Sequence, residues 1–383
     1  MGVGLCLVLT SCSSGVLEDD PVAERSPAPA APVASPSPTP PAGEQFSLVA
    51  TGDVLLHKPL WHQAKRDGTD GEWNFAPMMD DVRPYVESAD VGLCHLETPL
   101  APAEGPYTSY PSFSGPPMIA DALAEVGYDV CSTASNHTFD KGGAGVDRTL
   151  DKLDEVGLKH TGSARSAAEA KRLTMLRVNG VKVAFLSYTY GFNGIAYPSG
   201  QTWRANLLDE QAILDEARRA RKAGAEVVVA SLHWGTEYQQ TPSDDQAYLA
   251  PKLARSGQID LLISHHAHVV EPVQKIGRTW VVYGLGNLLA DHDTPGKANA
   301  EGLLTRFTFS KAPGAKRFSV SKAEYVPLLM TKDQPHRVLD VRKALQTQEY
   351  GSTTRARLQQ ALRRTTKVVE SMGGVRKGLV PAE

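Results

Sequence analysis

Short apolar runs alternate with amphipathic segments along most of the chain. Five of the runs have the length and composition of buried strands. They cover residues 46–52, 90–96, 128–134, 225–232 and 259–264. Apolar residues at helical spacing occupy residues 116–126, 144–156, 209–223 and 243–256. Two more strands are expected at residues 280–283 and 302–309. The alternation predicts an α/β domain with enough strands for two mixed sheets.

The five strand-like runs each lead into residues that can bind a metal. The residues at these exits are Asp53, Glu97, Asn136, His137, His233, His265, His266 and His268. In open α/β sheets, sites form at the carboxyl ends of the strands. Carboxylates, an amide and imidazoles are the ligands that Zn, Mn and Fe bind. The sequence therefore predicts a metal centre, whereas a polar loop that is rich in histidine is the alternative interpretation of residues 265–268.

The residue types suggest distinct roles at a centre with one or two ions. A metal pair needs a bridging carboxylate and terminal nitrogen or oxygen ligands. We expect carboxylate ligands from Asp53 and Glu97, an amide oxygen from Asn136, and imidazoles from His233, His266 and His268. His137 is expected to protonate a leaving group, oriented by Asp140. Water activated by the metal would be the nucleophile.

The remaining histidines carry weaker signals. His265 is expected to be a neighbour of the ligands and not a ligand. His57 is equally compatible with a ligand and with an ordinary loop residue. Structural or surface positions are expected for His62, His95, His160, His292 and His336.

The first 45 residues are not expected to belong to the domain. Residues 3–9 are apolar but too few to span a membrane. They lead into Leu9-Thr10-Ser11-Cys12, which resembles a bacterial lipobox, so residues 1–12 are expected to be a lipoprotein signal with Cys12 lipidated. No Lys or Arg precedes Arg25, which leaves an ordinary apolar N-terminus as the alternative. The Pro/Ala/Ser-rich residues 13–45 cannot bury enough apolar surface to fold, and as an extended tether they would reach roughly 100 Å.

The net charge limits the expected partners, and the positions of the cysteines bear on their oxidation state. The net charge is −3 and the sequence pI is about 6.4, so nucleic acid is not an expected partner. Cys94 and Cys131 fall in predicted strands, where buried free thiols are expected. A disulfide is the alternative if the two strands are neighbours in an oxidising compartment.

The last part of the chain, residues 331–383, is expected to be a helical extension. Apolar residues from Leu358 to Met372 fall on one helical stripe with arginines around it. Packing of this stripe on the domain is favoured over contact with an anionic surface.

Six stretches together resemble a known family. They are Thr51–Asp53, Leu96–Leu100, Ser135–Gly142, His233–Tyr238, His265–Val269 and Tyr283–Asn287. In this order they resemble the CapA family of poly-γ-glutamate capsule synthesis proteins, whose domain is similar to calcineurin-like metallophosphoesterases. The resemblance covers residues 46–330 and implies a four-layer α/β/β/α sandwich with the metal site at one edge of two mixed sheets.

The resemblance also implies roles for the candidate ligands. Asp53 and His268 would bind a first metal, Glu97 would bridge, Asn136, His233 and His266 would bind a second, and His137 would be the general acid. Three departures weaken the match. The Asp-x-His motif of the phosphoesterases becomes Asp53 followed only at the fourth position by His57, Glu97 is longer than Asp, and His265 replaces a glycine.

The implied function is an extracytoplasmic, lipid-anchored, metal-dependent hydrolase of an anionic polymer or a phosphoester. It would use Mn, Fe or Zn in capsule or poly-γ-glutamate biosynthesis, with other capsule-synthesis proteins as partners. The alternatives are a non-catalytic assembly or export component and a metal-dependent wall peptide or amide hydrolase. Trp234, Glu237 and Tyr238 suit either a substrate wall or core packing, and Asn287 either a site or a simple turn.

Overall fold

The computed structural model describes residues 1–2, 44–292 and 298–382. The described residues from Glu44 onward group into one unit. The predicted lipidation site Cys12, with residues 3–43 of the predicted signal and tether, lies outside the described residues. Among the residues that are described, no helix has both the length and the apolar character needed to cross a membrane.

The first sheet joins a parallel half to an antiparallel half. Its strand order is β14-β13-β12-β1-β2-β3-β4, with β11 beside β1 and β15 beside β13. The strands are β1 (Glu44–Val54), β2 (Val91–Leu96), β3 (Val130–Ser132), β4 (Lys159–Thr161), β11 (Asn287–Leu289), β12 (Glu301–Lys311), β13 (Ser319–Met330), β14 (Val338–Asp340) and β15 (Leu379–Pro381). Strands β1 to β4 are parallel, whereas β12 to β14 continue the sheet antiparallel from β1.

The second sheet is also mixed. Its order is β5-β6-β7-β8-β10-β9. The strands are β5 (Thr174–Val178), β6 (Val181–Thr189), β7 (Val227–Trp234), β8 (Leu261–His266), β9 (Val273–Ile276) and β10 (Thr279–Val282). Strands β6, β7, β8 and β10 are parallel, and the outer strands β5 and β9 pair antiparallel.

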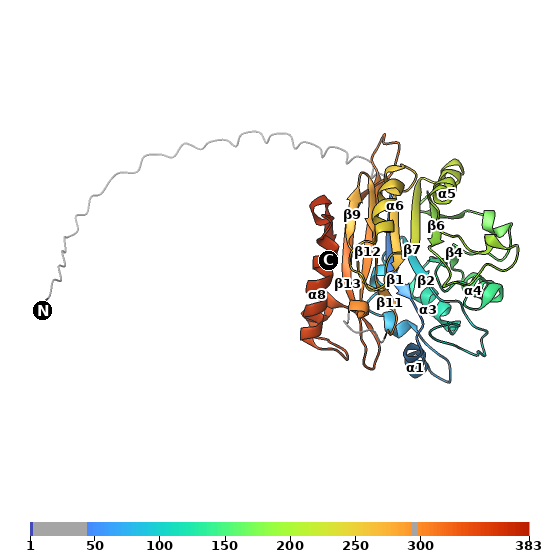
Figure 1. Cartoon of the computed structure of the whole chain (residues 1–383). Helices are drawn as coiled ribbons and strands as arrows, with labels where there is room; N and C mark the ends of the chain where they lie inside the picture. Colours follow the sequence, from blue (N-terminus) through green and yellow to red (C-terminus); the bar gives the residue numbers. More distant parts are fainter. Residues whose placement is uncertain (3–43, 293–297, 383) are drawn as a thin grey trace, which may run out of the picture. The chain divides into compact units, whose positions relative to one another are not determined.

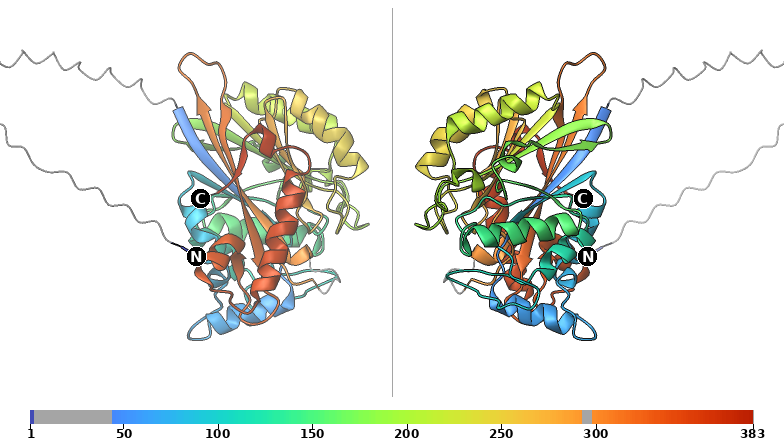
Figure 2. Two further views of the ribbon diagram at one scale, coloured as in Figure 1. Left: turned by 90° about the vertical axis from the view of Figure 1, so that its left-hand side faces the viewer. Right: turned by 90° about the vertical axis from the view of Figure 1, so that its right-hand side faces the viewer.

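The two-residue side-chain period of the strands separates the apolar core into layers. Leu48 and Ala50 of β1 pack toward the second sheet, whereas Val49 packs toward helices on the outer face. In β6, Phe185 faces the first sheet and Ala184 faces the helices on the far side. This arrangement confirms the predicted α/β/β/α sandwich (Figures 1 and 2).

Helices cover the outer face of each sheet. The helices of the first outer layer are α1 (Lys58–Asp67), α2 (Arg83–Glu87), α3 (Met118–Val126) and α4 (Gly142–Glu155), and those of the second are α5 (Glu210–Lys222) and α6 (Asp244–Arg255). Short 3₁₀ turns are η1 (Ala76–Met79), η2 (Glu169–Lys171), η3 (Thr202–Arg204), η4 (Ala298–Ala300) and η5 (Val375–Lys377). The predicted strands and helices therefore lie where the apolar pattern placed them, to within a few residues.

The C-terminal helices α7 (Val341–Thr347) and α8 (Arg355–Glu370) pack on the first sheet. Leu358, Ala361 and Val369 form the buried stripe of α8, which lies along β12 and β13 (Figures 1 and 2). Glu301 of β12 is buried and accepts hydrogen bonds from Arg357 and Arg364 of the helix. The expectation that the apolar stripe packs on the domain is confirmed.

A disulfide joins Cys94 of β2 to Cys131 of β3. The two residues are directly paired in neighbouring parallel strands, with their Cα atoms 4.5 Å apart. The expectation of two free thiols was wrong, because the sequence does not show that β2 and β3 are adjacent and in register.

Candidate metal centre

The carboxyl ends of parallel strands from both sheets meet at one place. Strands β1, β2 and β3 of the first sheet lead into Asp53, Glu97 and Asn136, and strands β7 and β8 of the second end in His233 and His266. Every predicted ligand is at most 4% exposed: Asp53, Glu97, Asn136, His233, His266 and His268. The structure brings all six residues together, as the strand-exit pattern predicted.

Asp53 is held by groups of the second sheet. Its Oδ1 lies 2.8 Å from Nδ1 of His265, and its Oδ2 lies 3.2 Å from Nδ1 of His268 and accepts from the backbone N–H of His266 at 3.2 Å. Burial acts to raise the pKa of Asp53, but the hydrogen bonds from His265 and His268 outweigh it and hold the pKa well below its usual value. Asp53 is therefore an ionised carboxylate at neutral pH.

A close backbone approach fixes the position of Asp53. The Asp53 N–H donates to the carbonyl of Gly286 at 2.9 Å. A Cβ on Gly52 would lie 2.1 Å from the same carbonyl oxygen, so only glycine allows this approach. The close approach of the Gly286 carbonyl therefore explains the glycine before Asp53.

Glu97 is a buried carboxylate without a hydrogen-bond donor in the described residues. Neither of its oxygens has a hydrogen-bond partner, although the residue is only 1% exposed. Its Oε1 lies 3.7 Å from Nε2 of His268 and 3.9 Å from Nε2 of His233. Burial raises the pKa of Glu97 well above its usual value. Because a buried carboxylate is costly unless a cation or donors compensate it, this position fits a metal ion.

Asn136 and His95 hold the two nitrogens of His233. Nε2 of His233 lies 2.9 Å from Oδ1 of Asn136, and Nδ1 lies 3.0 Å from Nε2 of His95. His95 continues the chain of contacts through its Nδ1, 2.8 Å from Oγ of Ser132. Such an outer partner fixes the orientation of a metal-binding imidazole.

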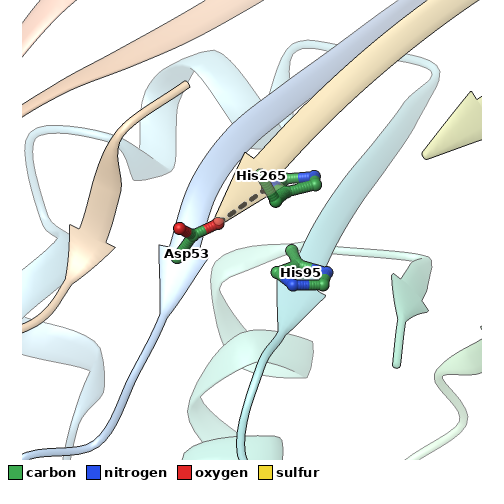
Figure 3. Close-up of side chains that lie close together, drawn as sticks. All are labelled: Asp53, His95 and His265. Carbon is green, nitrogen blue, oxygen red and sulfur yellow. Dashed lines mark hydrogen bonds and ion pairs between the residues drawn. The ribbon is translucent and has the colours of Figure 1, made fainter. Parts of the chain in front are cut away.

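His95 and His265 lie beside Asp53, at the ends of β2 and β8 (Figure 3). Ligand atoms of Asp53, His95 and His265 fall within 4.8 Å of one another. The rings of His95 and His265 are nevertheless stacked, with their centroids 4.0 Å apart and an angle of 17° between their planes. Because imidazole lone pairs lie in the ring plane, two stacked rings cannot aim them at one ion. The geometry therefore favours outer positions for both histidines.

His137 faces a cavity of about 710 Å³ beside the predicted ligands. Its Nδ1 lies 2.8 Å from Oδ2 of Asp140, and the same Oδ2 also accepts a hydrogen bond from the backbone N–H of Phe113. Since a carboxylate only accepts, Nδ1 carries the proton of this bond. Nε2 of His137 is then the nitrogen available for proton transfer, as its predicted role requires.

Other cavity residues extend the site beyond the predicted set. His57 and His292 line the cavity with their rings 4.7 Å apart, but neither falls in a group of mutually close ligand atoms among the described residues. Glu237 and Tyr238 also line it and are exposed. Trp234 is instead buried among α5 and α6, which settles it as a core residue.

Sequence reasoning did not find His95 and only partly considered Asn287. Nδ1 of His268 lies 3.0 Å from Oδ1 of Asn287, so Asn287 orients a predicted ligand. His95 stands two residues before Glu97, and the two-residue period of an extended chain places both on one side. This two-residue spacing was the signal in the sequence that could have identified His95. The remaining histidines lie apart: His62 is exposed, His160 is half-buried near Asp154, and buried His336 contacts the Thr331 carbonyl.

Comparison with known proteins identifies relatives of this chain. The family model described as bacterial capsule synthesis protein PGA_cap matches residues 47–292. The capsule biosynthesis protein CapA of Bacillus anthracis is 27% identical over 257 residues, which are 65% of this chain and 60% of that protein. The PGA biosynthesis protein CapA of Bacillus subtilis is 29% identical over 215 residues, 55% of each chain. The chain thus covers less than two thirds of the length of these relatives.

Solved structures with a similar arrangement include the calcineurin-like phosphoesterase YfkN from Bacillus subtilis. The match has a TM-score of 0.44 and 14% identity, and it covers 85% of this chain and 98% of that chain.

Proposed function

Because the chain belongs to the family of bacterial capsule synthesis proteins described as PGA_cap, we propose that it is a metal-dependent hydrolase in capsule or poly-γ-glutamate synthesis. The substrate would be an anionic polymer or a phosphoester. The observation that carries the proposal is the buried Glu97 carboxylate, which lacks a hydrogen-bond donor in the described residues and faces two imidazoles.

The ligands would be shared between one or two divalent ions. Asp53, Glu97 and His268 have ligand atoms within 4.8 Å of one another and would hold one ion. Asn136 and His233, already in contact with each other, would hold a second with His266. Mixed nitrogen and oxygen ligands suit Mn, Fe or Zn. Such an ion would act as a Lewis acid and would activate water near neutral pH.

The chain's own residues would handle the proton on the leaving group. Asp140 holds the His137 ring through Nδ1 and leaves Nε2 to donate to the leaving atom. The ring edge packs on Phe113, with centroids 4.8 Å apart, which limits rotation. Asp140 is therefore proposed as a positioning residue and His137 as the general acid.

We propose that the domain works outside the cytoplasm, tethered through a lipid on Cys12. The disulfide between Cys94 and Cys131 supports this location, because disulfides persist in oxidising compartments. Other capsule-synthesis proteins would be its partners there.

The alternative is a non-catalytic assembly or export component. Leu55 occupies the position where the Asp-x-His motif of the phosphoesterases has its histidine, and Leu55 cannot bind a metal. A centre that has lost a ligand can keep the fold without turnover. This observation is what favours the alternative.

Metal content of the full chain tests the proposal. We expect one to two equivalents of Mn, Fe or Zn in the wild type, none in the His266→Ala, His268→Ala double variant, and wild-type content in His62→Ala, which changes an exposed histidine. Turnover of phosphoesters, γ-glutamyl polymers and wall amides by the loaded protein then identifies the bond cleaved.

Two outcomes would contradict the proposal. Full turnover by the metal-free double variant would remove the metal from the chemistry. If the wild-type protein binds no ion after reconstitution with Mn, Fe and Zn, the assembly or export role is the remaining candidate. That role predicts that loss of the protein impairs polymer export, although the protein turns over no substrate.

A further inference from the structure

The loop that follows β7 reaches the metal centre from the cavity side. We propose that Glu237 of this loop is an additional metal ligand, which binds the ion from the solvent side opposite the buried carboxylates. This inference rests on the proposed metal centre and adds a residue to it.

The Glu237 carboxylate lies close to two predicted ligands. A carboxylate oxygen of Glu237 and ring nitrogens of His266 and His268 all lie within 4.8 Å of one another. Ligand bonds to Zn are about 2.0–2.2 Å long, so two ligands of one ion lie at most about 4.4 Å apart. Small side-chain rotations therefore suffice to bring the Glu237 carboxylate onto the first ion beside His268.

The backbone of the loop is fixed against the histidine turn. The Tyr238 N–H donates to the carbonyl of Ala267 at 2.8 Å, between His266 and His268. Tyr238, His266 and His268 all have left-handed backbones, with φ of 63°, 91° and 54°. Non-glycine residues adopt this region rarely, and such residues concentrate at functional sites. The three strained residues meet where the Glu237 carboxylate approaches the imidazoles.

Glu237 would also complete a deficient ligand set. Asp53, Glu97 and His268 give one ion three ligands, and Leu55 lines the cavity where the resemblance implies a histidine. The Glu237 carboxylate lines the same cavity. It supplies the missing ligand from a different segment of the chain.

The charge of the Glu237 carboxylate also favours metal binding. Within the described residues, no ion pair involves the exposed Glu237 carboxylate. A free carboxylate in this cavity would repel an anionic substrate by like charge. Coordination to a divalent ion removes that conflict, because the ion outweighs the charge of the ligand.

Calorimetric titration of the full metal-free chain with Mn²⁺ tests the inference. We expect Glu237→Gln to weaken binding of one ion at least tenfold, and Glu237→Asp to weaken it less. Glu44→Gln is the matched control, because it removes an exposed carboxylate at the opposite end of β1 from Asp53, about 30 Å away. The electron paramagnetic resonance spectrum of bound Mn²⁺ should change in Glu237→Gln and not in the control.

The outcomes separate this inference from the proposed function. Wild-type affinity and spectrum in Glu237→Gln, with binding abolished in His266→Ala, His268→Ala, would overturn the role of Glu237 alone. A wild-type chain that binds no Mn²⁺, Fe²⁺ or Zn²⁺ would overturn both. Equal weakening by Glu237→Gln and Glu44→Gln would reduce the effect to general electrostatics and also overturn the ligand assignment.

Discussion

The two sheets contribute different atoms to the candidate metal centre. The first sheet provides the oxygen donors Asp53, Glu97 and Asn136. The second provides the nitrogen donors His233, His266 and His268. Neither set alone provides the mixed nitrogen and oxygen ligands proposed for this centre. The candidate centre therefore depends on the face-to-face packing of the two sheets, with their carboxyl ends at one edge.

Two buried carboxyl groups, Asp53 of β1 and Glu271 after β8, differ in pKa. Asp53 on the first sheet is surrounded by imidazoles, and its pKa lies well below the usual value. Glu271, after β8 of the second sheet, is fully buried with one oxygen lacking a partner, and burial raises its pKa to about 9. The Asp53 carboxyl group is thus ionised because imidazoles donate to it, whereas the Glu271 carboxyl group stays neutral at pH 7 because its hydrogen-bond donor is the uncharged Gln246 amide.

Loss of the Asp53 carboxylate should break the link between the sheets most severely. Asp53→Ala leaves His265 without its buried acceptor and removes the carboxylate that pairs with His268, which should lower the free energy of unfolding of the metal-free protein by about 3–5 kcal/mol. Urea titration measures this loss. The control Asp129→Ala removes a carboxylate that accepts only within the first sheet, from the Gly92 N–H, and should cost about 1–2 kcal/mol. Equal losses would refute the special role of contacts between sheets.

The covalent link within the first sheet has no counterpart in the described part of the second. The Cys94→Ala, Cys131→Ala variant should lose about 2–4 kcal/mol of stability, because the unfolded chain regains the freedom of a loop of 37 residues. Thermal unfolding with and without a reducing agent measures the effect. The wild type should respond to the reductant and the variant should not; a response in both would assign the effect to another cause.

Stability should depend on pH through Glu271. Between its ordinary pKa of 4.5 and about 9, the unfolded chain loses the proton and the folded chain keeps it. Folding then takes up a proton, so the free energy of unfolding falls as pH rises across this window. Relative to Glu271→Gln, which retains an acceptor for Gln246, the wild type should lose on the order of 4 kcal/mol between pH 5 and 8. Parallel pH profiles would show that Glu271 does not titrate between the two states.

The smallest effect is expected where the first sheet supports a nitrogen donor of the second. His95→Ala removes the group that holds Nδ1 of His233 and should weaken metal binding about tenfold without changing the number of ions. His95→Gln keeps a polar group there and should recover part of the affinity. Calorimetry distinguishes this outcome from loss of a whole site, which would make His95 a ligand.

Local signals decided the elements and the strand exits. Ser243 and Gln246 form a capping box that starts α6, and Asp209 caps α5, so both helices begin where short-range hydrogen bonds require. The exit residues Asp53 and His266 could be found because an apolar run followed by a ligand is visible within ten residues. Strand β4, Lys159–Thr161, has no apolar run, and pairing with β3 alone makes it a strand.

The sequence by itself determined which residues could bind a metal, because residue type and strand periodicity are local properties. Tertiary structure decided which of them meet. His95 and His233 are 138 residues apart and belong to different sheets, yet their rings are in contact. Cys94 and Cys131 pair because β2 and β3 are adjacent in one register. Strand order, register and sheet packing depend on the burial of the whole core, and no single segment carries that information.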